Sequence, residues 1–200
     1  VRLLGVVVWS MDEFEADDAL ATGARRFAAD VDQVRILTPD KDLGWCIKGD
    51  RVVQVDRRQK KVIDEATFRA MRGFAPASMA DYLALTGDAA DGIPGLPGFG
   101  SKGAALLMGA YGRLEDIPEL PYQWKVKPRG ALQQAATLKA MRSEAYLYRK
   151  LATLVDTVPL VEAIEDLKWK GVPRSTFEAW CDDLGVTTMK TAPKRYEVIP

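Results

Sequence analysis

The chain has 200 residues and a mass of 22.1 kDa, and 48% of its residues are hydrophobic, a composition that supports a buried core and excludes intrinsic disorder. The 28 basic and 28 acidic residues balance, so any charge-driven function must come from local segregation of charge. Histidine is absent, which removes the commonest general base and zinc ligand and favours carboxylates as the groups for any hydrolytic chemistry.

The first half of the chain has the pattern of an α/β fold. Leu3–Trp9 is a valine-rich apolar run without alternation, which predicts a strand covered on both faces. The helical spacing of Glu15–Ala29 and the apolar run Val34–Thr38 follow, and strand, helix and strand in this order predict a parallel sheet. Arg51–Val55 and Val62–Ile63 flank a charged turn and predict a short hairpin at the sheet edge.

The second half is predicted to be helical. Asp64–Met71 makes a short helix capped by Asp64, and Ala77–Thr86 makes a second, entered through Pro76. Gly87–Gly103 is rich in glycine and predicts a structured loop. Further helices are expected over Ala104–Tyr111, Ala131–Leu154 and Ser175–Leu184. We expect an α/β domain over residues 1–75 and an all-helical domain over residues 76–200.

Three groups of acidic residues stand out by position. They are Glu15, Asp17 and Asp18 at the start of the first predicted helix, Asp40 and Asp42 after the second strand, and Asp88 and Asp91 at the head of the glycine-rich loop. Helix dipoles and turn chemistry explain any one group. Ligands of open parallel sheets bind beyond the carboxyl ends of the strands, where the first two groups lie, so we expect a shared crevice.

Such a crevice needs a cation. Two carboxylates about 4 Å apart repel by about 4 kcal/mol at an effective dielectric constant near 20. Neither histidine nor cysteine belongs to these groups, and an all-oxygen site favours Mg²⁺ or Mn²⁺. Two such ions activate a water and stabilise the leaving oxygen of a phosphodiester, which is the arrangement of two-metal nucleases.

The glycine-rich loop reads PGLPGFGSKGAA from Pro94 to Ala105. It resembles the hairpin of a helix-hairpin-helix, in which glycines let backbone amides approach a DNA phosphate and the following helix N-terminus adds its dipole. Lys102 stands where it can add an ionic contact to the phosphate. The alternative is a plain turn between two helices.

The string GDAADGIPGLPGFGSKGAALL, with EFEADDALAT and TPDKDL before it, resembles the 5′ to 3′ exonuclease and flap endonuclease family, which includes the nuclease domain of bacterial DNA polymerase I. The matching motifs extend from Glu15 to about Leu114. The resemblance implies a partial PIN-like, Rossmann-like nuclease core followed by a helical domain with a helix-three-turn-helix at about residues 87–112. It also implies Mg²⁺-dependent hydrolysis of DNA at 5′ ends and flaps.

The resemblance also assigns roles to residues. Its metal ligands, which are also its catalytic residues, match Glu15, Asp17 and Asp18 for the first ion and Asp40, Asp42, Asp88 and Asp91 for the second. Its DNA-gripping hairpin matches Gly95, Gly98, Gly100, Ser101 and Lys102, and its carbonyls order a K⁺ ion. Gly92 and Ala90 replace the family's usual Asn and Ser, and neither is a carboxylate.

The family pattern has further parts before this chain begins. Family members start with a strand ending in a metal-binding Asp, a further Asp, and an arch whose Lys and Arg engage the scissile phosphate. We therefore expect this chain to be the C-terminal two-thirds of a longer product. The alternatives are a reduced relative that is a noncatalytic branched-DNA binding module retaining the hairpin, or an inactive fragment that lacks the N-terminal metal ligands and the arch. A ribonuclease that shares the α/β core is a third reading, and the hairpin argues against it.

Partners and location follow from the same features. We expect a monomer that binds DNA without sequence preference. We also expect it in the cytoplasm and not in a membrane, since Leu3–Trp9 is far shorter than the roughly 20 residues of a membrane span. The cysteines Cys46 and Cys181 lie far apart, which suits a reducing compartment. Seven basic residues after the hairpin either extend the DNA track or form a solvated helix face; they are Lys125, Lys127, Arg129, Lys139, Arg142, Arg149 and Lys150.

Overall fold

The computed structural model describes residues 1–197, which form two compact units. One unit contains residues 1–19 together with the chain from residue 158 onward, and the other contains residues 20–157. Each unit has hydrophobic clusters of its own, so each is described by itself.

A three-stranded sheet lies in the unit of residues 20–157. Its strands are β1 (Val34–Leu37), β2 (Val52–Asp56) and β3 (Lys61–Ile63), in that order across the sheet. β1 and β2 are parallel, and β2 and β3 form an antiparallel hairpin with β3 at the edge. The predicted second strand and edge hairpin are therefore confirmed.

Helix α1 (Ala16–Phe27) covers this small sheet. Its Ala24 packs with Ile36 of β1, Val52 of β2 and Leu43. Leu43 belongs to a 3-10 turn, η2 (Asp42–Cys46), within the crossover from β1 to β2. The parallel strands β1 and β2 are thus joined by a 3-10 turn, whereas the predicted parallel pair was Leu3–Trp9 and Val34–Thr38 with a helix between them.

The predicted strand over Leu3–Trp9 is wrong. Arg2–Leu4 form a short 3-10 helix, which ends at Gly5 with φ of 73°. No strand within residues 1–197 pairs with this segment. Leu3 and Trp9 are half-buried against separate small hydrophobic clusters, whereas Leu4 and Val6 are exposed. None of residues 3–9 is buried, so the segment is not covered on both faces as predicted.

Five further helices complete the unit of residues 20–157. They are α2 (Glu65–Arg72), α3 (Met79–Thr86), α4 (Ser101–Tyr111), α5 (Ala131–Ala140) and α6 (Arg142–Ala152). The Asp64 side chain caps α2 as predicted, accepting a hydrogen bond from the Thr67 N–H at 2.7 Å. The single helix predicted over Ala131–Leu154 is divided into α5 and α6, because Met141 leaves the helical conformation with φ of −120° and ψ of 30°.

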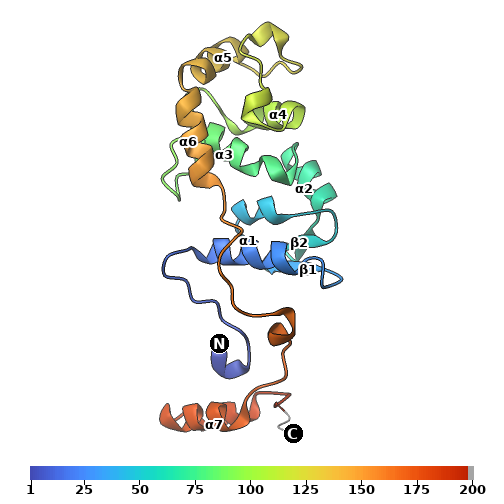
Figure 1. Cartoon of the computed structure of the whole chain (residues 1–200), viewed down its shortest axis with the longest axis vertical. Coiled ribbons are helices and arrows are strands. Elements are labelled where there is room, and N and C mark those ends of the chain that lie inside the picture. Colours follow the sequence, from blue (N-terminus) through green and yellow to red (C-terminus); the bar gives the residue numbers. More distant parts are fainter. Residues whose placement is uncertain (198–200) are drawn as a thin grey trace. The chain divides into compact units, whose positions relative to one another are not determined.

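Helix α3 is the centre of the helical core, and it lies beside α6 (Figure 1). Its buried Asp81 accepts hydrogen bonds from the Leu114 N–H at 3.0 Å and from Arg149 of α6 at 3.1 Å. Arg149 also pairs with Glu115 at 2.7 Å, and this hydrogen bond lowers the pKa of Glu115 to about 2. One guanidinium therefore ties together α3, α6 and the turn that follows α4.

The unit that contains the chain ends includes α7 (Arg174–Asp183). Phe177 and Cys181 of this helix pack with Val172, and the following Gly185 has φ of 66°, as expected for a glycine that closes a helix. Among residues 1–197, no helix has both the length and the apolar character that a membrane span requires.

The Arg149 network gives a stability prediction. Arg149→Met leaves Asp81 buried without its cationic partner, so we expect the free energy of unfolding to fall by about 2–4 kcal/mol. Arg69→Met breaks an exposed ion pair with Glu65 on α2, and should cost less than about 1 kcal/mol. Urea unfolding at pH 7 measures both, and equal losses would contradict the central role of Arg149.

Candidate functional site

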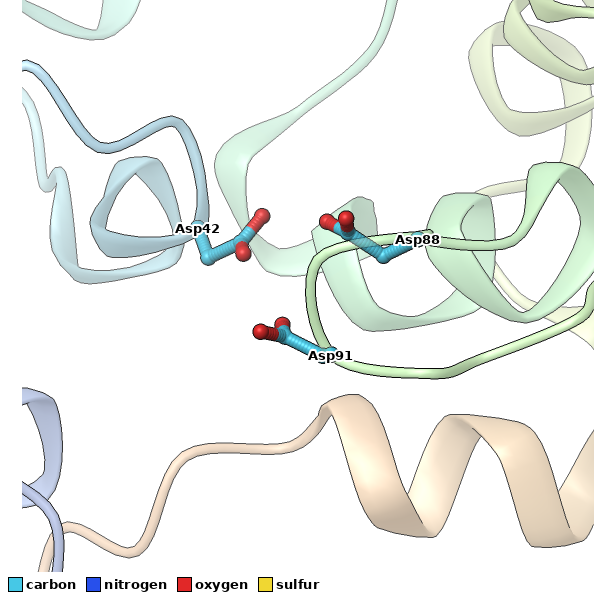
Figure 2. A group of neighbouring side chains, drawn as sticks. All are labelled: Asp42, Asp88 and Asp91. Atoms are coloured by element: carbon cyan, nitrogen blue, oxygen red, sulfur yellow. The ribbon is translucent and has the colours of Figure 1, made fainter.

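Three of the predicted carboxylates meet in the structure. Asp42 begins the turn after β1, and Asp88 and Asp91 come from the loop between α3 and α4. Each offers an oxygen, and these oxygens all lie within 4.8 Å of one another. The three side chains point toward a common space (Figure 2). The hairpin of β2 and β3 and the helices α2 and α3 lie between Asp42 and Asp88 in the sequence, yet the acidic groups on either side form one cluster.

The backbone holds Asp88 and Asp91 in place. Asp88 and Ile93 exchange two backbone hydrogen bonds of 2.8 Å, which close the loop between them. The Asp88 side chain also accepts the Ala90 N–H at 3.1 Å. The geometry of these two carboxylates is therefore set by a short closed turn at the end of a buried helix.

A chain of local hydrogen bonds sets the position of Asp42. The Thr38 hydroxyl accepts the Asp40 N–H at 3.1 Å, and the Asp40 carboxylate accepts the Asp42 N–H at 3.0 Å. The buried Gln54 of β2 donates to the backbone carbonyls of Thr38 and Asp40. Asp40 thus orients the turn that presents Asp42, while its own carboxylate accepts from the backbone.

A lysine lies among these acids. Lys41 forms an ion pair with Asp88, and its ammonium lies 3.6 Å from Oδ1 of Asp42. Burial would lower the pKa of Lys41, but the hydrogen bond to Asp88 and the charges of the aspartates outweigh it and raise the pKa. Its hydrogen bond to Asp88 lowers the pKa of that carboxyl. Sequence analysis missed Lys41, although a lysine between two aspartates after a strand was a visible signal.

The charged form of the Asp42 carboxylate is poorly stabilised in this arrangement. Burial raises its pKa to about 6, the charges of Asp40, Asp88 and Asp91 add to the increase, and Lys41 opposes it. Within the described residues its buried Oδ1 has no hydrogen-bond partner. A buried carboxylate oxygen whose nearest cation is the Lys41 ammonium at 3.6 Å, beside two other carboxylates, belongs to a donor set that fits a divalent cation with oxygen ligands.

The remaining acids of the prediction lie at the start of α1. Glu15 precedes the helix and Asp17 and Asp18 occupy its first turn, where Oδ2 of Asp18 accepts the Glu15 N–H at 3.1 Å. These residues belong to the unit that contains the chain ends. Their convergence with the cluster of Asp42, Asp88 and Asp91 stays a prediction.

The glycine-rich loop folds into a tight hairpin anchored by apolar side chains. Gly87 and Gly95 have φ of 77° and 68°, and a Cβ on Gly95 would lie 2.4 Å from the Gly87 nitrogen. Leu96 is buried and its N–H donates to the Leu85 carbonyl of α3 at 2.8 Å. Glycine is therefore required where the two sides of the loop touch.

Helix α4 starts directly after the hairpin. Gly98 has φ of 83°, and Gly100 is the residue before the first turn of the helix. Ser101 and Lys102 are exposed in that first turn, at the positive end of the helix dipole. A glycine hairpin followed by an exposed helix N-terminus is an arrangement that suits an anionic ligand such as phosphate.

Family models match both parts of the chain. The model described as "5'-3' exonuclease, N-terminal resolvase-like domain" matches residues 1–73, and "5'-3' exonuclease, C-terminal SAM fold" matches residues 74–175. The chain belongs to the 5′-3′ exonuclease family.

Curated relatives of this family are longer than the chain. DNA polymerase I of Pseudomonas aeruginosa is 35% identical over 202 residues, which cover 92% of this chain and 21% of the polymerase. Flap endonuclease Xni of Serratia proteamaculans is 33% identical over 170 residues, covering 82% of this chain and 63% of the relative. The chain thus spans about a fifth of the polymerases and under two-thirds of the stand-alone flap endonucleases.

Solved structures share the fold. A bacteriophage T5 5′-exonuclease with bound zinc ions aligns with a TM-score of 0.62 at 16% identity, covering 90% of this chain and 62% of that chain. The T5 D15 flap endonuclease in a complex with DNA and metal ions aligns with a TM-score of 0.59 at 18% identity and the same coverage. The expected architecture of a PIN-like core followed by a helical domain is thereby confirmed for the 5′-3′ exonuclease fold.

The glycine contact in the hairpin gives a second prediction. Gly95→Ala adds a clash with the Gly87 backbone to the strain of a positive φ, so we expect a loss of about 2–4 kcal/mol in the free energy of unfolding. Gly92→Ala is the matched control, because its φ of 69° is similar and its Cβ would meet open space; it should cost about 1–2 kcal/mol. Urea unfolding compares them, and a smaller loss for Gly95→Ala would contradict the close contact.

Proposed function

We propose that this chain carries a Mg²⁺- or Mn²⁺-dependent 5′-3′ exonuclease and flap endonuclease activity that hydrolyses DNA phosphodiester bonds. The observation that carries the proposal is the meeting of Asp42, Asp88 and Asp91, with one buried carboxylate oxygen that accepts no hydrogen bond within the described residues. Membership of the 5′-3′ exonuclease family supports the reaction type.

The roles of the acids follow from their positions. Asp42, Asp88 and Asp91 would hold one divalent ion, with Asp40 orienting the turn that carries Asp42. Glu15, Asp17 and Asp18 would serve a second ion, as the family resemblance implies. Divalent ions at such sites supply Lewis acidity and neutralise charge that develops on the phosphodiester oxygens. The carboxylates fix where that positive charge lies.

The hairpin would hold the substrate. Gly95, Gly98 and Gly100 leave the backbone open to a phosphate, and Ser101 and Lys102 add the helix N-terminus and a positive charge. Contacts of this kind position a duplex and carry no sequence information, so binding would be independent of sequence. A K⁺ ion held by the hairpin carbonyls is part of the proposal.

Three further expectations belong to the proposal. The domain boundary would lie near residue 75, between the end of α2 and the start of α3. The protein would act as a monomer, because each DNA end offers one scissile phosphate to one active site. It would work in the cytoplasm, where bacterial DNA is found.

Cleavage of a labelled 5′-flap duplex tests the proposal. We expect divalent-ion-dependent cleavage by the chain, and a loss of roughly 100-fold or more in Asp88→Asn and Asp91→Asn, since each removes a carboxylate from the metal-binding cluster. Asp183→Asn on the exposed end of α7 removes the same charge and should cleave normally. Flap binding without cleavage at any Mg²⁺ or Mn²⁺ concentration would indicate a noncatalytic branched-DNA binding module instead.

Calorimetry with the metal alone tests the ion count. Titration of the chain with Mn²⁺ should show two binding events, of which Asp42→Asn removes one, because its unsatisfied oxygen is a proposed ligand. A single event that survives Asp42→Asn would place the ion elsewhere. The absence of any binding event would contradict the metal centre itself.

A further inference from the structure

The structure separates the basic residues that follow the hairpin into two classes. The first class has partners within the protein. Arg149 pairs with the buried Asp81, Arg142 donates to two backbone carbonyls after α4, and Lys139 forms an exposed ion pair with Glu119 at 3.2 Å. These three side chains are therefore already engaged by other parts of the chain.

The second class forms no ion pair within residues 1–197; Lys150 on α6 is one member, and the other three lie together in the segment of residues 124–130, which we call the basic connector. Lys125, Lys127 and Arg129 are exposed, and within residues 1–197 none of them forms an ion pair with a carboxylate. Trp124 and Pro128 alternate with them and are buried. The connector is therefore anchored by apolar residues and presents three uncompensated positive charges to solvent.

Local contacts fix the connector against α4. The indole of Trp124 donates to the Pro118 carbonyl at 2.7 Å. The Lys125 N–H donates to the hydroxyl of Tyr111 at 2.6 Å, and the Lys125 ammonium lies 5.5 Å from the centre of that ring. Val126 shares a surface cavity of about 590 Å³ with Lys102 of α4. The connector thus lies beside the helix that carries the proposed phosphate-binding N-terminus.

One buried side chain joins the connector to the hairpin. Gln134 of α5 is 3% exposed, and its amide nitrogen donates to the Gly98 carbonyl at 3.0 Å and to the Arg129 carbonyl at 3.5 Å. Gly103 makes room for it, since a Cβ there would lie 2.8 Å from that nitrogen. The Gln134 amide thus links hairpin and connector directly, in addition to the packing of Trp124 in the same hydrophobic cluster as Leu96 of the hairpin.

We propose that the basic connector is a second phosphate-binding segment for duplex DNA, held in position relative to the hairpin by Gln134. This inference rests on the proposed function, because it extends the track of the same duplex. Anchored, exposed and uncompensated cations beside a glycine hairpin suit a ligand with repeated phosphates. Lys125, Lys127 and Arg129 contact backbone phosphates and contribute affinity without base preference.

The salt dependence of binding tests the connector. Anisotropy of a labelled 5′-flap duplex, without divalent ions so that no cleavage occurs, gives the slope of log K against log salt concentration. The triple variant Lys125→Gln, Lys127→Gln, Arg129→Gln should make this negative slope shallower by about 2–3, since each phosphate contact contributes about −0.9. The control triple variant Lys139→Gln, Lys168→Gln, Lys170→Gln removes the same net charge and should change the slope by less than about 1.

The outcomes separate this inference from the proposed function. Equal slopes in the connector variant and the control variant overturn the inference, while cleavage by the unaltered chain can still stand. Binding with the expected slope change, but no cleavage at any Mg²⁺ or Mn²⁺ concentration, supports the inference and contradicts the proposed catalysis. Failure of the unaltered chain to bind duplex DNA overturns both.

A double-mutant cycle tests Gln134 as a positioning residue. Gln134→Leu should weaken binding about tenfold in the native background and clearly less in the connector variant, because its effect depends on the cations that it positions. A merely structural role predicts the same loss in both backgrounds, which would overturn this part of the inference. Thermal unfolding followed by circular dichroism confirms that each variant is folded at the temperature of the binding assay.

Discussion

Mutual repulsion among Asp42, Asp88 and Asp91 is the constraint around which this part of the protein is built. Like charges at such separations cost about 4 kcal/mol per pair at 4 Å and an effective dielectric constant of 20. Backbone hydrogen bonds hold the carboxylates in place regardless of that cost, through the closed turn of Asp88–Ile93 and the chain from Thr38 to Asp42. Lys41 offsets part of the negative charge. The sheet and α3 serve chiefly to bring these two turns together.

Local signals predicted most of the helices and the edge hairpin. The Asp64 cap, the closing glycines and the charged turn between β2 and β3 depend on neighbours in the sequence, so they can be recognised without a structure. The first apolar segment could not be assigned in this way. Leu3 and Trp9 pack in small clusters while Leu4 and Val6 are exposed, and only the fold shows that no strand lies alongside this segment within residues 1–197.

Contacts between side chains that lie far apart in the sequence could be predicted only in part. Position after the strands suggested that the acids of the first helix share a crevice with Asp40 and Asp42, and the family resemblance added Asp88 and Asp91. The structure brings Asp42, Asp88 and Asp91 together. The role of Gln134 depends on which two carbonyls happen to lie near its amide, and no local pattern encodes that. The basic residues after the hairpin look alike in sequence, and only their partners distinguish core cations from exposed ones.

The loop between α3 and α4 carries acids at its beginning and glycines at its end. Both groups are joined by covalent bonds and by the contact of Gly87 with Gly95. Under the proposed function, the distance between the acids that hold the metal at the scissile bond and the hairpin that binds the double helix is therefore fixed. The number of nucleotides between anchor and incision would then be encoded in the length of one loop, and altering that length would move the cut.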